Sequence, residues 1–164
     1  LILPAFALGG TGLIRHKAWR SLALWIGGLF FFLQVPENLI LCRHCPYYAQ
    51  GGRRTLLCHA NAGLLKLWRF NPHPMTRLEK ATFLTGATLL FAFPTAINTL
   101  KHEHLLAAGS AGSGVFWVWA MRRLVCCECP NFSCPFNTVP QSIRSVYLRR
   151  NPIFARAWGL REAL

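Results

Sequence analysis

Long apolar stretches with few charged positions dominate much of the chain. The clearest of them cover residues 21–41, 81–100 and 105–121. Their lengths of 21, 20 and 17 residues are close to the roughly 20 residues that a helix needs to cross the hydrocarbon core of a bilayer. Apolar positions run around every side of these segments, as in a lipid-exposed helix and not in the one-sided helix of a soluble protein. We therefore expect three membrane spans here.

A fourth apolar stretch covers residues 1–14. It is short for a span, since at ~1.5 Å per residue it would be about 21 Å long as a helix. The chain begins without Met, so we expect this stretch to be the end of an incomplete helix. The predicted fold is all-α: a polytopic membrane bundle of about four spans, with the first incomplete.

The spans divide the chain into alternating apolar and polar parts. Residues 1–41 are expected to hold the first two spans, and residues 81–121 a helical hairpin of two more. Residues 42–80 form a Cys-rich loop, in which the pattern GLLKLWRF at 63–70 predicts a short interfacial helix. Residues 122–164 form a Cys-rich basic tail, in which Pro152 is expected to separate two short helices.

Composition supports a membrane protein. Hydrophobic residues make up 53% of the chain and charged residues only 14%, although 18 Lys and Arg against five Glu give a net charge of +13. A disordered basic tail is excluded because disorder requires low hydrophobicity. An ordinary soluble domain has about a quarter charged residues. We attribute the positive charge to membrane orientation and contact with anionic lipids, and we expect no nucleic-acid partner because no basic recognition element is present.

The distribution of basic residues predicts which side of the membrane each loop faces. Two crossings separate the cysteine-bearing segments 42–80 and 122–164, so both are expected on one side. Each carries seven Lys or Arg, against four in the remainder of the chain, and the positive-inside rule then places them in the cytoplasm. The dense basic run at 15–20 opposes this orientation. A break at Pro36 that turned the second span into a re-entrant hairpin would place both this run and the cysteine segments in the cytoplasm.

Two further features lie in the spans. Glu37 follows Pro36 near the end of an apolar stretch, and we expect its carboxylate near the head groups, within reach of Arg43 or facing a partner. The run of small residues at 107–114 predicts close helix packing within the bundle.

The seven cysteines carry the candidate chemistry. Two Cys-x-x-Cys pairs, Cys42/Cys45 and Cys126/Cys129, each follow a predicted span. Two such pairs supply the four thiolates of a structural zinc or an iron–sulfur cluster. We expect these four cysteines as the first ligands, with Cys58 and Cys134 next and Cys127 as the non-ligand; His44 and His59 are spare nitrogen donors.

The choice between zinc and a cluster rests on the residues around the cysteines. Cys45, Cys129 and Cys134 each precede proline, a pairing that ends one cluster run of bacterial ferredoxins. The spacing at positions 126, 129 and 134 resembles part of an iron–sulfur ligand run. These features, with the aromatic residues nearby, favour a cluster over zinc as the cofactor.

The function expected from these features is a small integral membrane subunit of a larger complex, in which the centre serves electron transfer or assembly. One alternative is a structural zinc that staples an accessory subunit. Another is a membrane thiol–disulfide oxidoreductase linked to quinone, since the run around Cys42 and Cys45 is similar to a helix-end Cys-x-x-Cys of that class; the reducing side and the odd number of cysteines oppose it. A cysteine-dependent protein acyltransferase is excluded because the chain contains no Asp.

Overall fold

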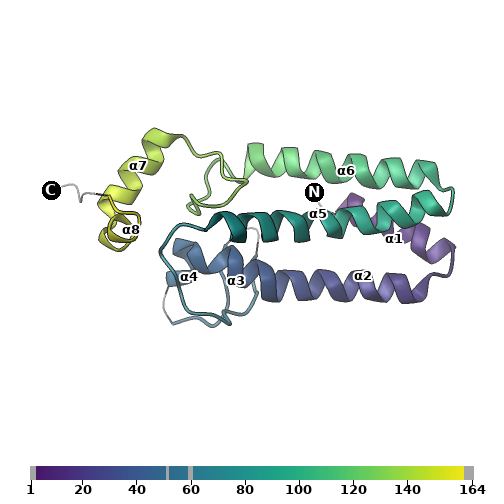
Figure 1. Ribbon diagram of the computed structural model, residues 1–164, viewed down its shortest axis with the longest axis horizontal. Coiled ribbons are helices and arrows are strands. Elements are labelled where there is room, and N and C mark those ends of the chain that lie inside the picture. Colours follow the sequence, from purple (N-terminus) through teal and green to yellow (C-terminus); the bar gives the residue numbers. More distant parts are fainter. Residues whose placement is uncertain (1–2, 51, 59–60, 161–164) are drawn as a thin grey trace. The chain divides into compact units, whose positions relative to one another are not determined.

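The computed structural model describes residues 3–50, 52–58 and 61–160 of the chain, in which the secondary-structure elements are all helices and no strand is present. Figure 1 shows the order of the helices. They are α1 (Leu3–Arg15), α2 (Trp19–Phe32), a π turn (Leu33–Glu37), α3 (Asn38–Ile40), a 3-10 turn (Cys42–His44), α4 (Pro46–Ala49), α5 (Arg77–Leu100), α6 (His104–Leu124), α7 (Gln141–Arg150) and α8 (Pro152–Ala157). The all-α prediction is confirmed for the described residues.

The chain divides into two compact units. Unit 1 contains residues 1–32 and 84–121, and unit 2 contains residues 33–83 and 122–164. Unit 1 therefore consists of α1, α2 and most of α5 and α6, while unit 2 holds the remaining short helices and the loops. All seven cysteines belong to unit 2.

Aromatic side chains form the core of unit 1. Phe6 stacks on Trp25 with ring centroids 5.1 Å apart, and its edge meets Phe91 at 5.9 Å. The Trp25 indole N–H donates a 2.8 Å hydrogen bond to the carbonyl of Leu90 in α5. This bond satisfies the polar edge of a buried ring, and it joins α2 to α5.

Small residues bring the helices of unit 1 together. Ser110 and Ala107 of α6 are buried. A side chain added at Gly114 would meet Phe91 of α5, and one added at Gly109 would meet Leu8 of α1. The prediction that the run at 107–114 packs within the bundle is therefore confirmed for these positions.

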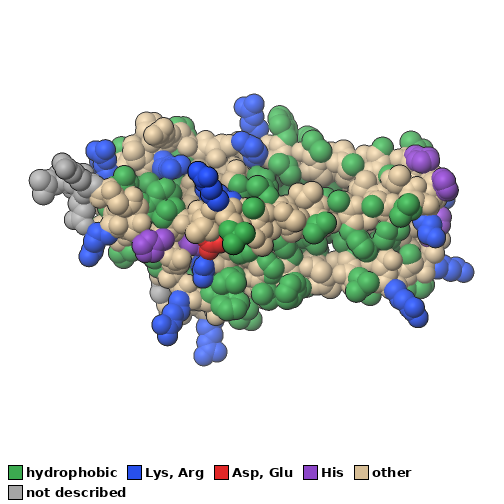
Figure 2. All heavy atoms as spheres, viewed as in Figure 1, with side chains coloured by type: hydrophobic (Ala, Val, Ile, Leu, Met, Phe, Trp, Pro, Cys, Tyr) green, Lys and Arg blue, Asp and Glu red, His purple; other side chains and the backbone are tan. Residues whose placement is uncertain are grey.

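Large apolar side chains cover the outside of unit 1. Leu24 is 71% exposed, Leu105 89% and Val115 72%, and Figure 2 shows hydrophobic side chains at the surface along α5 and α6. Such an outward apolar face is typical of helices surrounded by lipid.

Two helices are long and apolar enough to cross a membrane. They are Trp19–His44, with 26 residues, and Arg77–Leu100, with 24. Only 22% and 17% of their apolar windows are buried, which distinguishes them from the core helices of a soluble protein. They contain the predicted spans 21–41 and 81–100. The predicted spans 1–14 and 105–121 form the helices α1 and α6, which do not meet this criterion within the described residues.

The second predicted span continues through Pro36. Residues 33–37 form a π turn with the proline inside it, and the helix resumes at Asn38. The wider turn accommodates the residue that lacks an N–H donor. The re-entrant break considered from the sequence is therefore absent.

The predicted interfacial helix at 63–70 is wrong. The chain there is extended and pairs with the preceding segment: the N–H of Leu56 donates to the carbonyl of Leu64 at 2.8 Å, and that of Lys66 to Arg54 at 2.7 Å. Gly63 takes a φ of +88° at the turn between the two arms, a conformation that glycine adopts at little cost. By contrast, Pro152 does separate two short helices, as predicted.

Candidate metal–thiolate centre

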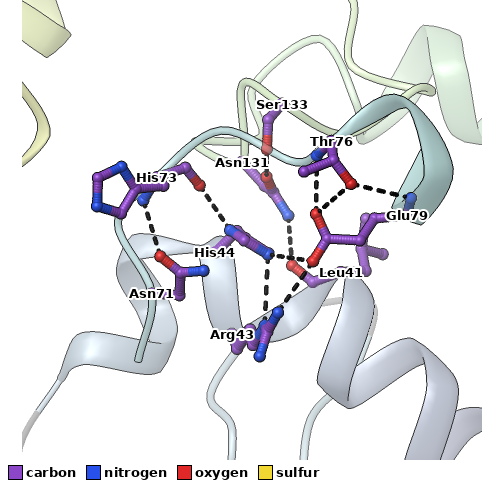
Figure 3. A network of polar contacts seen from close by, with 9 residues as sticks. All are labelled: Leu41, Arg43, His44, Asn71, His73, Thr76, Glu79, Asn131 and Ser133. Carbon is purple, nitrogen blue, oxygen red and sulfur yellow. Dashed lines mark hydrogen bonds and ion pairs between the residues drawn. The ribbon is translucent and has the colours of Figure 1, made fainter. Parts of the chain in front are cut away.

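A polar network organises the first cysteine segment in unit 2 (Figure 3). Glu79, in the first turn of α5, accepts hydrogen bonds from the backbone N–H and the hydroxyl of Thr76 at 2.7 and 2.9 Å. The Thr76 hydroxyl accepts the N–H of Glu79 in return, which completes a capping box. Arg43 donates to the same carboxylate at 2.9 Å. The 42–45 turn is thus tied to the start of α5.

Both ring nitrogens of His44 are occupied in this network. Nδ1 donates to the carbonyl of His73 at 2.6 Å, and Nε2 lies 3.4 Å from both the Glu79 carboxylate and the Arg43 guanidinium. The side chain is almost fully buried. His44 is therefore used as a structural link, and the other spare nitrogen donor, His59, lies outside the described residues.

Asn131 connects the second cysteine segment to the first (Figure 3). Its amide donates a 2.9 Å hydrogen bond to the carbonyl of Leu41, the residue before Cys42. Its side-chain oxygen accepts a hydrogen bond from Ser133. Because Asn131 lies between Cys129 and Cys134, this buried contact brings the two segments together without a disulfide; all seven cysteines are free thiols.

The three Cys-Pro steps share one local geometry. In each, the backbone N–H two residues after the cysteine interacts with its sulfur and lowers the pKa of the thiol: Tyr47 at Cys45, Asn131 at Cys129, and Phe136 at Cys134, where it forms a hydrogen bond of 3.4 Å. Proline has no N–H and fixes its own φ, so the first free donor after the cysteine is two residues on. A neutral thiol is a weak acceptor, whereas N–H donors directed at sulfur stabilise the charged thiolate.

Cys58 has the same type of contact at a different turn. The N–H of Asn61 donates to the Cys58 sulfur at 3.2 Å. The Asn61 amide also donates to the Glu37 carboxylate at 2.7 Å and to the Cys42 sulfur at 3.2 Å. Asn61 therefore joins the extended arm to the end of the first candidate span, and Glu37 pairs with it and not with Arg43.

Electrostatic interactions place these four sulfurs in one neighbourhood. Burial raises the pKa of the Cys45 thiol to about 12, and the N–H from Tyr47 opposes the rise. The charges of three other cysteines raise the Cys45 pKa further: Cys129, Cys58 and Cys134. Cys129 interacts in turn with Cys58, and Cys134 with Cys129. Cys45 and Cys129 thus each interact with the other three members of the set.

The remaining predicted ligands lie beside this set. Cys42 interacts with Cys45 and Cys58, and Cys126 with Cys129 and Cys134. No backbone N–H donates to either sulfur in the described part of the chain. The Cys127 thiol instead donates to the carbonyl of Arg123 at 3.2 Å, an orientation along α6 that suits the predicted non-ligand.

As they stand, the sulfurs do not enclose an ion. Among the described residues, no group of three or more His, Cys, Asp or Glu side chains is arranged to hold a metal ion directly. The Cys45 and Cys134 thiols are neutral at pH 7, since burial raises the pKa of each to about 12. Binding an ion would release these protons and draw the sulfurs inward.

Sequence reasoning missed the asparagines that support the cysteines. Asn61 and Asn131 are 8% and 4% exposed and make the contacts described above. The sequence could have pointed to Asn131, because this residue lies between two Cys-Pro steps. No neighbouring sequence feature points to Asn61. In comparisons with models of protein families, with curated proteins and with solved structures, the chain matches none.

Proposed function

We propose that this chain is a small polytopic membrane protein whose two cysteine segments jointly bind one metal centre on the cytoplasmic side. The ligands are Cys45, Cys58, Cys129 and Cys134, and the centre is an iron–sulfur cluster or a single zinc ion. Four thiolates suit both centres. The observation that carries the proposal is that each of these four sulfurs accepts a backbone N–H.

The same observation favours these ligands over the two Cys-x-x-Cys pairs. Cys42 is held by a side-chain amide, and Cys126 has no N–H donor among the described residues. Backbone N–H groups are fixed dipoles, and hydrogen bonds to ligand sulfurs tune the reduction potential of a cluster. We place Cys42 and Cys126 next to the centre and outside its ligand set.

Four membrane spans provide the setting for this centre. We count α1 and α6 as the other two spans, because both belong to unit 1 together with parts of the two candidate spans. The excess of Lys and Arg in the cysteine segments supports their cytoplasmic location. With a cluster, the role is electron transfer within a larger membrane complex; with zinc, it is to hold the two segments together for assembly.

Thiol–disulfide exchange is disfavoured as the function. The attacking species in such exchange is the thiolate. Burial raises the pKa of Cys45 and Cys134 to about 12, so without a metal these thiols stay protonated at neutral pH. They are poor nucleophiles in that state.

Metal analysis of the full chain tests the proposal. Protein purified anaerobically in detergent is assayed for zinc, iron and sulfide, and its visible spectrum is recorded. We expect zinc alone, or iron and sulfide with charge-transfer absorption. Wild-type protein with neither, and with a disulfide between Cys42 and Cys45, would contradict the proposal and favour the oxidoreductase.

Serine variants test the ligand set. Replacing Cys45, Cys58, Cys129 or Cys134 singly should abolish most metal binding, while Cys127→Ser serves as the matched control and retains it. Cys42→Ser and Cys126→Ser should also retain the metal. If these two lose it as completely as Cys45→Ser, the ligands are the two Cys-x-x-Cys pairs.

A further inference from the structure

An open groove lies in unit 2 between α4 and the elbow of α7 and α8. Its volume is about 290 Å3, close to the lower end of ligand pockets. Phe70 and Phe154 line it with their rings at 5.9 Å, and Tyr147 lies at 6.3 Å from Phe154. Ala49 and Ile153 complete its apolar lining. These contacts give the groove fixed aromatic walls.

The segment that forms one wall of the groove is rich in arginine. Residues 141–158 contain four Arg and no acidic residue. Arg149 and Arg150 end α7 and are exposed, and they immediately precede Asn151 and Pro152, which line the groove. Neither arginine forms an ion pair with a described residue. Their place next to two lining residues in the sequence makes them the nearest basic residues along the chain for an anion bound at the groove.

The surrounding surface suits a membrane interface. Ile143 is 60% exposed, Val146 49% and Ile153 58%, next to these arginines on α7 and α8. A short helix that combines exposed apolar and basic residues is typical of the boundary between head groups and acyl chains. α4, which supplies one wall, begins two residues after the candidate span Trp19–His44 ends. The groove is therefore connected by a short piece of chain to a membrane-crossing helix.

We propose that this groove binds one anionic phospholipid. The phosphate pairs with Arg149 and Arg150, and an acyl chain lies along Phe70, Phe154 and Ile153. Apolar walls, and two arginines next to them in the sequence that form no ion pair with a described residue, match the two parts of such a lipid. An acidic peptide would leave the aromatic walls without a partner, and a zwitterionic lipid would bring a choline cation next to the arginines. The lipid site uses none of the proposed metal ligands, although Pro46, the proline of one Cys-Pro step, belongs to its lining.

Native mass spectrometry of the detergent-solubilised full chain tests the proposal. Titration with phosphatidylglycerol should give a bound adduct, and phosphatidylcholine should bind at least tenfold more weakly, since each basic residue near an anionic lipid contributes about 1 kcal/mol. Equal binding of the two lipids would overturn the proposal, as would preferential binding of a Glu-rich peptide.

Two matched pairs of variants locate the site. R149Q/R150Q should weaken phosphatidylglycerol binding about tenfold, while R53Q/R54Q removes the same charge from another exposed part of unit 2 and should not. A49W should fill the groove and block binding, while Q50W, at the exposed neighbour that does not line it, should not. Equal effects within either pair would overturn the proposal. Metal content and thermal unfolding of each variant confirm that it is folded.

Discussion

Proline determines the cysteine geometry at the scale of single residues. Each of the three Cys-Pro steps places a backbone N–H at the sulfur. The sequence showed these steps, but the Cys-x-x-Cys spacing gave a different first choice of ligands. Spacing alone cannot tell which sulfurs receive an N–H, because that depends on the turn after the cysteine.

The partners of charged side chains were less predictable from the sequence than the association of the two cysteine segments. Glu37 was expected near the head groups, within reach of Arg43 or facing a partner, but Arg43 pairs with Glu79 at 2.9 Å. The partner of Glu37 is Asn61, 24 positions away. A neutral amide distant in the sequence gives no signal that single-chain reasoning can use.

Asn131→Ala should loosen unit 2. The buried amide is lost from the Leu41 carbonyl, and an unsatisfied buried acceptor costs about 1–3 kcal/mol. Thermal unfolding of the metal-free protein measures the loss. Gln50→Ala, at an exposed position, is the control and should change stability by less than about 0.5 kcal/mol. An unchanged midpoint in Asn131→Ala would show that the two cysteine segments associate by other contacts.

Helices were predictable where apolar residues run continuously. The sequence predicted the stretches that form α1, α5 and α6, because charge is absent from most of their length. The prediction of a helix failed at 63–70. The five apolar and two basic residues of this segment fit an extended arm as well as a helix. The turn at Gly63 and the backbone bonds to residues 54–56 decide between them, and these depend on the fold around the arm.

Gly12 allows α1 to approach α5. A methyl group added there would overlap the side chain of Asn98, which is fully buried. Gly12→Ala should therefore destabilise unit 1 by about 1–3 kcal/mol, measured by thermal unfolding in detergent. Gly112→Ala is the control, since an added methyl there has no neighbour within 4 Å.

A second substitution tests the cause of that loss. Neither polar atom of the Asn98 side chain has a hydrogen-bond partner among the described residues, so Asn98→Ala removes the overlapping atoms without breaking a hydrogen bond seen there. In the double variant Gly12→Ala/Asn98→Ala, most of the loss seen in Gly12→Ala should be recovered. If the stability losses of the two single variants simply add in the double variant, the strain in Gly12→Ala does not come from Asn98.

The division into two units was only partly foreseen at the scale of the whole molecule. The cysteine segments were expected together because two crossings separate them, and both belong to unit 2. The boundary, however, falls inside helices: α5 and α6 each contribute to both units. The hydropathy of the sequence changes at the end of a membrane span. A compact unit ends where the tertiary contacts within it end, and these are not visible in the hydropathy.

The proposed topology places both cysteine segments on one side of the membrane. Protease sites inserted at the exposed Gly52 and Gly159 should be cut from the same side of sealed vesicles. Sites at Lys17 and Lys101, in the loops between helices, should be cut only from the other side. Cleavage at Gly52 and Gly159 from opposite sides would exclude a shared centre.

Removal of the metal should affect one unit only. All proposed ligands lie in unit 2, so chelation should increase amide hydrogen exchange around residues 45–47, 61–66 and 129–138. Exchange in α1 and α2, which belong to unit 1, should stay unchanged and serves as the internal control. An equal increase in both units would indicate that the metal stabilises the whole chain as one cooperative body.

The Cys-Pro geometry also has a consequence for how related chains could be recognised. The donor to each sulfur is a backbone group, so the side chains at positions 47, 131 and 136 are free to vary as far as that bond is concerned. Only proline is excluded there, because it has no N–H. A useful search pattern is therefore three Cys-Pro steps, each followed by any residue except proline, with a further cysteine near the turn of an extended arm. Such a pattern tolerates extensive divergence elsewhere and would find relatives that overall similarity does not.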